Sequence, residues 1–207
     1  MTQTRDAALQ DFLTCLQEAF AVSAAPPQSR DFATELFSAL ATPTPAGTAL
    51  PQQLPVLQHL PAACAMAQAA PPAVAKLASA LERLAPRLAW KVRASGGPKA
   101  SANWPEGHTN AVIVGSGGLE ERTDVAIGAS LLAPQVRYPD HTHPPEELYM
   151  ILSQSRFQHG EDAWIEPGPG GTFHNAPGIK HAMASGDAPL LAVWTMIIRP
   201  DANTARS

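Results

Sequence analysis

The chain has 207 residues, of which 45% are hydrophobic and 15% are charged, and its formal net charge is −4. A chain of this length can bury one core of ordinary size, so we expect no second independent domain. No run of basic residues occurs in the sequence. The electrostatic attraction that drives binding to nucleic acid therefore has no source, and we expect no nucleic-acid partner.

Two observations predict a cytoplasmic protein that does not span a membrane. Residues 1–20 carry charges within their apolar pattern, and they lack the basic start and unbroken apolar stretch of a secretory signal. The apolar run LLAVWTMII at 190–198 is too short for a helix that crosses a bilayer. We therefore expect a soluble protein with no membrane partner.

Residues 1–95 show the apolar periodicity of α-helices. Apolar side chains recur at three- and four-residue steps at Leu9, Phe12, Leu13, Leu16 and Phe20, and again at Val74, Leu77, Leu81 and Leu84. Asp31 is a candidate N-cap for a helix between these stretches, and the prolines of 42–55 predict a loop or an extended connection. We predict a helical region over 1–95 that packs on the rest of the chain or forms a homodimer contact.

The two cysteines, Cys15 and Cys64, both fall within the helical patterning and far from the histidines. Two cysteines give neither a disulfide framework nor a thiolate zinc site. We expect both thiols to be buried as small apolar groups.

Residues 96–207 are typical of a β-structure with many turns. Short β-prone runs at 111–115, 124–133, 147–153 and 190–198 are separated by clusters of Gly, Pro, Asn and Asp. Many short strands with frequent turns favour a sandwich or a barrel. The sequence therefore predicts a mainly β body that follows a helical N-terminal region.

The most informative stretch, YPDHTHPPEELYMIL at 138–152, holds three candidate metal ligands. His141 and His143 are two residues apart, so both imidazoles leave the same face of an extended chain, and Glu147 has the same parity. A turn at Pro177–Gly178 then precedes His181, which can reach the same pocket from a neighbouring strand. Three imidazoles and a carboxylate suit one divalent transition metal: we expect zinc or iron first, and manganese, cobalt and nickel remain open.

The order and spacing of these residues resemble the cupin motifs. His141, His143 and Glu147 match H-x-H-x3-E, and Pro177, Gly178 and His181 resemble P-x-G-x2-H. The resemblance implies a single cupin barrel, that is, a double-stranded β-helix or jelly roll, over 96–207. Metal binding by His141, His143, Glu147 and His181 is part of what it implies.

The only two tyrosines of the chain, Tyr138 and Tyr149, bracket the metal motif. Tyr149 is in phase with Glu147, and a nearby divalent cation favours a phenolate, so Tyr149 is a candidate general base. The pattern Y-x2-H-x-H-x3-E-x-Y resembles the cupin-type dimethylsulfoniopropionate (DMSP) lyases, and most of all their Q-type members. In that family the tyrosine after the glutamate is the proposed base, and Tyr138 matches a second pocket tyrosine.

The resemblance implies a metal-dependent β-elimination that releases dimethyl sulfide and acrylate, with the metal binding the substrate carboxylate and Tyr149 removing the proton. Glu147 either stays bound to the metal or yields to the substrate. An aromatic face can hold the sulfonium cation, and the candidates for this contact are Tyr138, Trp194, Trp164 and Phe173. We interpret His159 and His174 as structural and place Lys180 in solvent.

Two other classes of protein would use the same ligands. One is a cupin dioxygenase or isomerase that acts on another small carboxylate or thiol compound. The other is a cupin that binds a small ligand without any reaction. A catalytic role for Tyr149 distinguishes the lyase from both.

Overall fold

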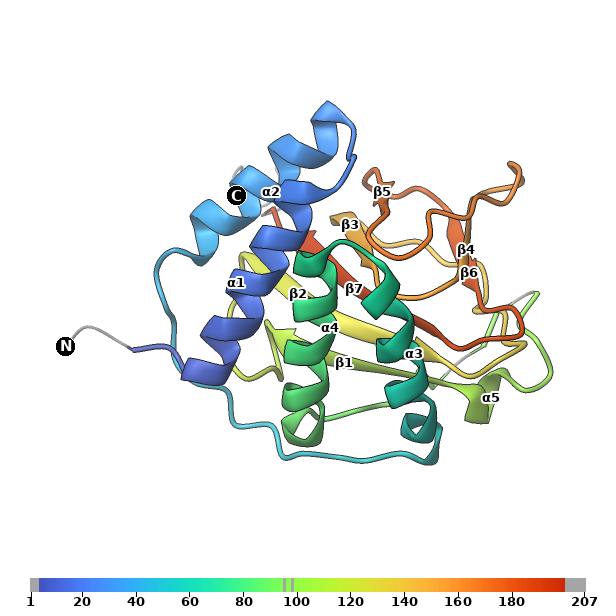
Figure 1. Ribbon diagram of the computed structural model, residues 1–207, viewed down its shortest axis with the longest axis horizontal. Helices are drawn as coiled ribbons and strands as arrows, with labels where there is room; N and C mark the ends of the chain where they lie inside the picture. Colours follow the sequence, from blue (N-terminus) through green and yellow to red (C-terminus); the bar gives the residue numbers. More distant parts are fainter. Residues whose placement is uncertain (1–3, 95, 98, 200–207) are drawn as a thin grey trace, which may run out of the picture.

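The computed structural model describes residues 4–94, 96–97 and 99–199. Helices come first and strands follow (Figure 1). The helices are α1 (Ala7–Val22), α2 (Pro27–Leu40), α3 (Leu60–Met66), α4 (Pro72–Leu84) and the short α5 (Trp104–Gly107), with 3-10 turns at Pro55–His59, Ala67–Ala69 and Ala85–Arg87. The strands are β1 (His108–Val114), β2 (Val125–Leu132), β3 (Glu146–Ile151), β4 (Arg156–His159), β5 (Thr172–Asn175), β6 (His181–Ala184) and β7 (Leu190–Ile197).

The strands form two antiparallel sheets. Five of them pair in the order β1-β2-β7-β3-β5, and β4 pairs with β6 in a second sheet. The predicted class, a cupin barrel of β-strands with an α-helical N-terminal region, is confirmed. The β-prone runs at 111–115, 124–133, 147–153 and 190–198 correspond to β1, β2, β3 and β7.

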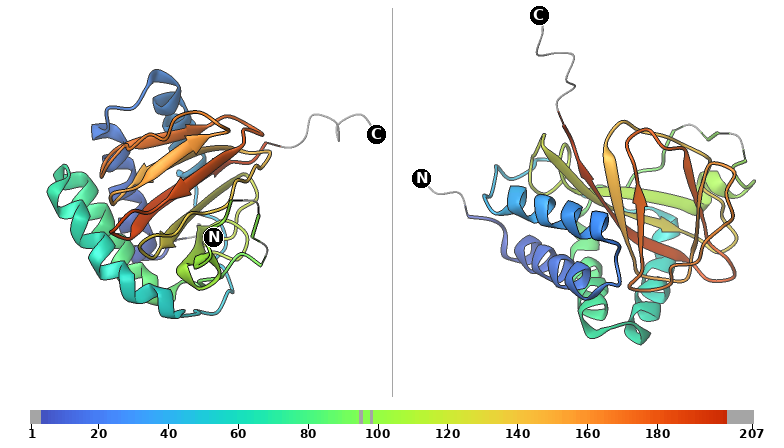
Figure 2. Two further views of the ribbon diagram at one scale, coloured as in Figure 1. Left: turned by 90° about the vertical axis from the view of Figure 1, so that its right-hand side faces the viewer. Right: turned by 90° about the horizontal axis from the view of Figure 1, so that it is seen from above.

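The five-stranded sheet is covered on both faces. Its outer face carries apolar residues such as Ile127, Leu148 and Val193, which share one buried cluster with the apolar residues of α1, α3 and α4. Figure 2 shows these helices packed along one side of the sheet. Its inner face meets β4 and β6 around a second buried cluster, which includes Tyr138, Tyr149 and Phe157. The helical region therefore acts as the outer layer of the barrel.

The apolar stripes of α1 and α4 are buried in the way that their spacing predicts. The carboxylate of Asp6 caps α1 by accepting a 3.0 Å hydrogen bond from the backbone N–H of Leu9. The expected cap at Asp31 is wrong, because α2 begins at Pro27 and Asp31 is an exposed residue inside the helix. Proline suits the first helical position, since it has no N–H to leave unpaired there.

Residues 42–54 form an extended connection without helix or strand, as the prolines predict. The division into 1–95 and 96–207 stays a prediction, because its boundary at Ser95 lies outside the described residues, as do the ends 1–3 and 200–207. Within the described residues, no helix combines the length and the apolar content that a bilayer crossing requires.

Cys15 and Cys64 are free and buried, which confirms their assignment as apolar groups. Burial raises the pKa of the Cys64 thiol to about 12. A thiol with such a pKa stays protonated at neutral pH and is a poor nucleophile or metal ligand.

A buried charge cluster joins the helical layer to the barrel. Glu120, which is 2% exposed, accepts hydrogen bonds from Arg5 at 2.6 and 3.0 Å and approaches Arg122 at 3.4 Å. The two arginines also donate to the carbonyl groups of Leu40 and Thr42, at the end of α2 and just after it. Burial acts to raise the pKa of Glu120, but the charge and hydrogen bonds of Arg5 outweigh it, with further help from Thr44, and the pKa lies below its usual value.

We predict that Glu120→Ala destabilises the protein by roughly 3–5 kcal/mol, because it leaves Arg5 and Arg122 buried without their shared anion. Urea unfolding followed by circular dichroism measures this change. The exposed pair Arg83–Asp11, at 2.6 Å, supplies the control, since Asp11→Ala should cost no more than about 1 kcal/mol. Equal losses in the two variants would contradict a structural role for the Glu120 cluster.

Candidate metal centre

Three of the predicted ligands meet at one point inside the barrel. Glu147 lies on β3, His181 opens β6, and His143 lies on the segment before β3; their ligand atoms are all within 4.8 Å of one another. Oε2 of Glu147 lies 3.1 Å from Nε2 of His143 and 3.3 Å from Nε2 of His181. Two ligand atoms bound about 2.0–2.2 Å from one metal ion are about 2.8–3.6 Å apart at the usual angles. The distances from Glu147 to the two histidines therefore fit a shared ion.

The backbone fixes how each histidine presents its ring. In all three histidines Nδ1 faces a main-chain carbonyl oxygen two residues away. The distances are 3.0 Å from His141 to Pro139, 2.9 Å from His143 to Pro145 and 3.1 Å from His181 to Ile179. A carbonyl oxygen can only accept, so Nδ1 carries the proton and Nε2 is free to bind a metal.

The inward nitrogens need a cation. Nε2 of His181 is buried and has no hydrogen-bond partner within the described part of the chain. With Nδ1 protonated, the Nε2 lone pairs of His143 and His181 are directed toward the carboxylate of Glu147. These contacts are favourable only when a positive charge lies between the atoms, either a proton or a metal ion. The donor set thus fits a divalent metal.

A tight turn brings the two histidine segments together. His141 and His181 pair across an antiparallel bridge, with backbone hydrogen bonds of 3.0 and 2.9 Å. The turn at Pro177–Gly178 precedes His181, and the φ of +73° at Gly178 is one that glycine adopts without strain. The N–H of Gly178 donates to the carbonyl group of His143 at 3.0 Å. The predicted delivery of His181 from a neighbouring strand is confirmed.

The site opens into a cavity of about 190 Å³ between the sheets. Its lining consists of Asn110, Ser130, Tyr138, His141, His143, Glu147, Tyr149, Met183, Trp194 and Met196. Glu147 and Tyr149 lie opposite Met196 and Trp194 on β7, so alternation along two paired strands places all four on the inner face. Tyr149 is therefore in phase with Glu147, as expected from the sequence.

Trp194 reaches its place in the lining because Gly128 lies opposite it on β2. A Cβ atom at residue 128 would come within 2.1 Å of the indole of Trp194 and 2.3 Å of the carbonyl oxygen of Ala111. Glycine thus leaves the space that the indole fills. The hydrophobic pattern of β2 did not point to this role.

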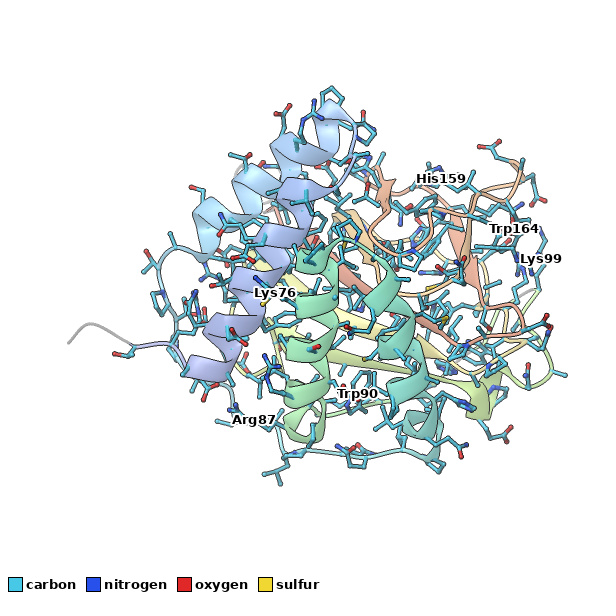
Figure 3. All side chains as sticks on the ribbon, viewed as in Figure 1. Lys76, Arg87, Trp90, Lys99, His159 and Trp164 are labelled. Carbon is cyan, nitrogen blue, oxygen red and sulfur yellow. The ribbon has the colours of Figure 1, made fainter. Side chains whose placement is uncertain are left out.

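The structure does not bring every predicted site residue to the cluster of His143, Glu147 and His181. His141 lines the cavity, with its ring centroid 4.1 Å from that of His181, but it is not part of the group of three ligands. Phe173 packs on Phe157, outside the lining. Trp164 has the guanidinium groups of two arginines over its ring and also lies outside the lining; Figure 3 places it on the barrel side, away from Lys76 of α4.

Lys180 is exposed and pairs with Glu161 at 3.3 Å, which confirms its place in solvent. Asn110, Ser130, Met183 and Met196 line the cavity although the sequence analysis did not single them out. The parity of β1, β2 and β7 would have found most of them once the register was known.

A family model for the DMSP lyases (dimethylsulfoniopropionate lyase) matches residues 28–192. The chain belongs to the DMSP lyase family. The putative dimethylsulfoniopropionate lyase DddL of Cereibacter sphaeroides is 32% identical to it over 149 residues, which cover 70% of this chain. The chain spans 61% of that relative's length.

Two solved structures of DMSP lyases share the fold of this family member. One, described with the DMSP lyases RdDddP and RnDddQII, has a TM-score of 0.71 and 22% identity, and covers 92% of each chain. The other, DddQ of Ruegeria pomeroyi, has a TM-score of 0.68 and 22% identity, and covers 96% of this chain and 94% of its own. At this identity the likeness supports the fold alone.

Two of the candidate ligands have pKa values that suit metal binding at neutral pH. Burial acts to raise the pKa of Glu147, but the imidazoles of His143 and His181 outweigh it and bring the pKa to about 2. Burial, followed by the nearby His181, lowers the pKa of His141 to about 4. At neutral pH Glu147 is therefore ionised and His141 is neutral, as metal ligation requires.

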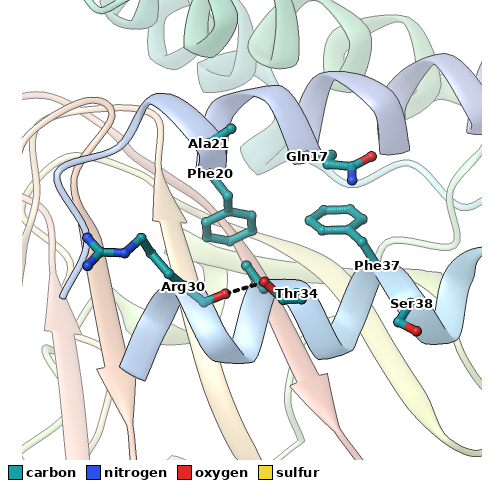
Figure 4. Close-up of a pocket in the computed structure, with 8 residues that line it drawn as sticks. Gln17, Phe20, Ala21, Arg30, Thr34, Phe37 and Ser38 are labelled. Carbon is teal, nitrogen blue, oxygen red and sulfur yellow. Dashed lines mark hydrogen bonds between the residues drawn. The ribbon is translucent and has the colours of Figure 1, made fainter. Parts of the chain in front are cut away.

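A larger cleft elsewhere on this DMSP lyase family member has a different character. The groove between α1 and α2, of about 500 Å³, is lined by residues that include Phe20, Phe37 and Arg30 (Figure 4), and it has no histidine or carboxylate in its lining. It therefore offers no metal ligands.

The apolar stripes that suggested a homodimer are buried within the chain, and the homodimer stays a prediction.

We predict that His181→Ala weakens Zn²⁺ binding strongly, because it removes one of the proposed ligands. Changes to residues that only support a ligand typically cost roughly 10–100-fold in affinity, and the loss here should be larger. Calorimetric titration of the metal-free protein with Zn²⁺ measures the dissociation constant. Lys180→Ala is the matched control, because it changes the exposed neighbour of His181 and leaves the ligands in place. Unaltered Zn²⁺ affinity in His181→Ala would rule out the site described above.

Proposed function

We propose that this chain cleaves DMSP into dimethyl sulfide and acrylate by β-elimination at a divalent metal centre. The main support for the proposal is that Tyr149 and Glu147 lie on the same face of β3. Both line the cavity that also contains the histidines. Membership of the DMSP lyase family supports the choice of substrate. A base and a cation-binding group within one small cavity are the parts that proton abstraction next to a carboxylate needs.

His143, Glu147 and His181, with His141 beside them, would hold the metal ion. Zinc and iron are the first candidates, and the ligand set also suits manganese, cobalt and nickel. When bound, the ion supplies positive charge that attracts the substrate carboxylate and acidifies the adjacent C–H bond.

Tyr149 is the proposed base. As the phenolate, Tyr149 would take the proton from the carbon next to the carboxylate, the C–H electron pair would become the new C=C bond, and the C–S bond would break. The sulfur keeps the C–S electron pair and leaves as neutral dimethyl sulfide, so no acid needs to protonate it. Burial, followed by the charge of Glu147, raises the pKa of Tyr149 well above its usual value in the metal-free site. A nearby divalent cation acts in the opposite direction, because it attracts the phenolate.

Tyr138 and Trp194 are the proposed partners of the sulfonium group. Both line the cavity, and aromatic faces attract soft cations. The phenol oxygen of Tyr138 accepts a hydrogen bond from the amide of Asn110 at 3.4 Å, and Ser130 donates to the oxygen of that amide at 2.5 Å. This chain of contacts fixes Tyr138 against the wall formed by β1 and β2.

We predict that the protein, loaded in turn with each divalent metal, releases dimethyl sulfide from DMSP, and that Tyr149→Phe lowers kcat by roughly 10²–10⁴-fold because it removes the base. Gas chromatography of the headspace above a sealed reaction measures the product. Zn²⁺ titration of the same variant is the control, since the phenylalanine should leave metal affinity within about twofold of wild type.

Two outcomes would contradict this proposal. Near-normal turnover by Tyr149→Phe would remove the tyrosine from the mechanism. A protein that binds metal but releases no dimethyl sulfide with any of the ions would exclude the lyase, and would favour a cupin that acts on, or only binds, another small carboxylate.

A further inference from the structure

A buried hydrogen-bond chain lies behind the metal ligand Glu147. Asn175 on β5 is 0% exposed, and its Nδ2 donates to Oε2 of Glu147 at 2.7 Å. Its Oδ1 lies 2.9 Å from Nε2 of His159 on β4. Asn175 was not among the candidate residues predicted from the sequence, and His159 was interpreted as structural.

Chemistry fixes the direction of this chain. The amide nitrogen of Asn175 donates to the carboxylate oxygen of Glu147, so the amide oxygen of Asn175 is turned toward His159. Nε2 of His159 therefore carries a proton and donates it to Asn175. The ring of His159 is also stacked on Phe173, with centroids 4.3 Å apart and planes at 29°. His159, labelled in Figure 3 on the barrel side, is thus held both by its ring face and by its N–H group.

The strand pairing places the hydrogen bond between Asn175 and His159 next to both Glu147 and His181. Asn175 lies directly opposite Glu147 in the β3–β5 ladder. His159 lies directly opposite His181 in the β4–β6 ladder. The hydrogen bond between Asn175 and His159 therefore links the two sheets next to the metal-binding residues.

The contact from Asn175 becomes more important once a cation is bound. With an ion bound, His143 and His181 would offer it their Nε2 lone pairs and would have no N–H group to donate to Glu147. Within the described residues, the amide of Asn175 is the remaining side-chain N–H within hydrogen-bond distance of this carboxylate. Because the amide is neutral, it orients Glu147 without neutralising the negative charge that attracts the metal.

We propose that Asn175, held by His159, is a positioning residue that sets the orientation of Glu147 for metal binding. The inference rests on the proposed metal centre and does not depend on which substrate the centre acts on. Asn175 acts through Glu147 and takes no part in the reaction itself.

The test measures the binding of Zn²⁺ alone to purified metal-free protein by competition with a chromogenic chelator. Asn175→Leu keeps the size of the side chain but removes its donor, and we expect the dissociation constant to rise by roughly 10–100-fold. His159→Phe keeps a ring to stack on Phe173 and removes only the hydrogen bond to Asn175. We expect a smaller, several-fold rise of the dissociation constant in His159→Phe, because this position is partly exposed. This variant also provides the test if Asn175→Leu does not fold.

His174→Leu is the matched control. His174 is the neighbour of Asn175 on β5, but its Nε2 contacts Glu146, which faces away from the cavity, at 2.7 Å. Its Zn²⁺ affinity should equal that of wild type. Urea unfolding of each metal-free variant, together with the visible absorption of the Co²⁺ form, separates a change in ligand geometry from a loss of fold.

Each result decides the question. Weaker Zn²⁺ binding and an altered Co²⁺ spectrum in Asn175→Leu and His159→Phe, with His174→Leu unchanged, support the inference. Affinities of Asn175→Leu and His159→Phe within about twofold of wild type overturn it and leave the metal centre intact. A wild-type protein that binds no Zn²⁺ or Co²⁺ overturns both the metal centre and the inference.

Discussion

The two-residue alternation of the five-stranded sheet is the constraint on which the rest of the molecule depends. Most of the residues of β2, β3 and β7 that face the helices are apolar, and the residues between them face the barrel interior. The helices remove the outer face from water, and the register is then fixed, because a slip by one residue would exchange the two faces. Glu147, Tyr149 and Trp194 are held in the cavity by the same packing that covers Leu148 and Val193.

The burial of Glu147 is a second constraint on the arrangement of the site. A carboxylate that is 1% exposed must be paired or hydrogen-bonded, since an isolated charge in the interior is very costly. Two imidazoles and one amide lie within 3.3 Å of its Oε2 atom. The imidazoles are in turn oriented by backbone carbonyl groups at 2.9 and 3.1 Å. The backbone therefore fixes the orientation of both imidazoles that contact Glu147.

The sequence predicts the parts of this arrangement that depend on local spacing. Two histidines two residues apart and the parity of Glu147 and Tyr149 follow from the geometry of one extended segment. The strands β4, β5 and β6 have four residues each, too few for a period to be recognised. Asn175 lies on one of them, and its role depends on pairing with β3, a contact between residues 28 positions apart. Such roles appear only once the register of the strands is known.

The same reasoning explains why Trp194 lines the cavity and Trp164 does not. Trp194 lies on a central strand whose inner face is fixed by its neighbours, with the space over Gly128 to receive the indole. Trp164 lies between strands, where no alternation directs its ring, and two arginines occupy its face. An aromatic face already covered by guanidinium groups repels a further cation. Of these two tryptophans, Trp194 is therefore the one that can offer a ring face to a cation in the cavity.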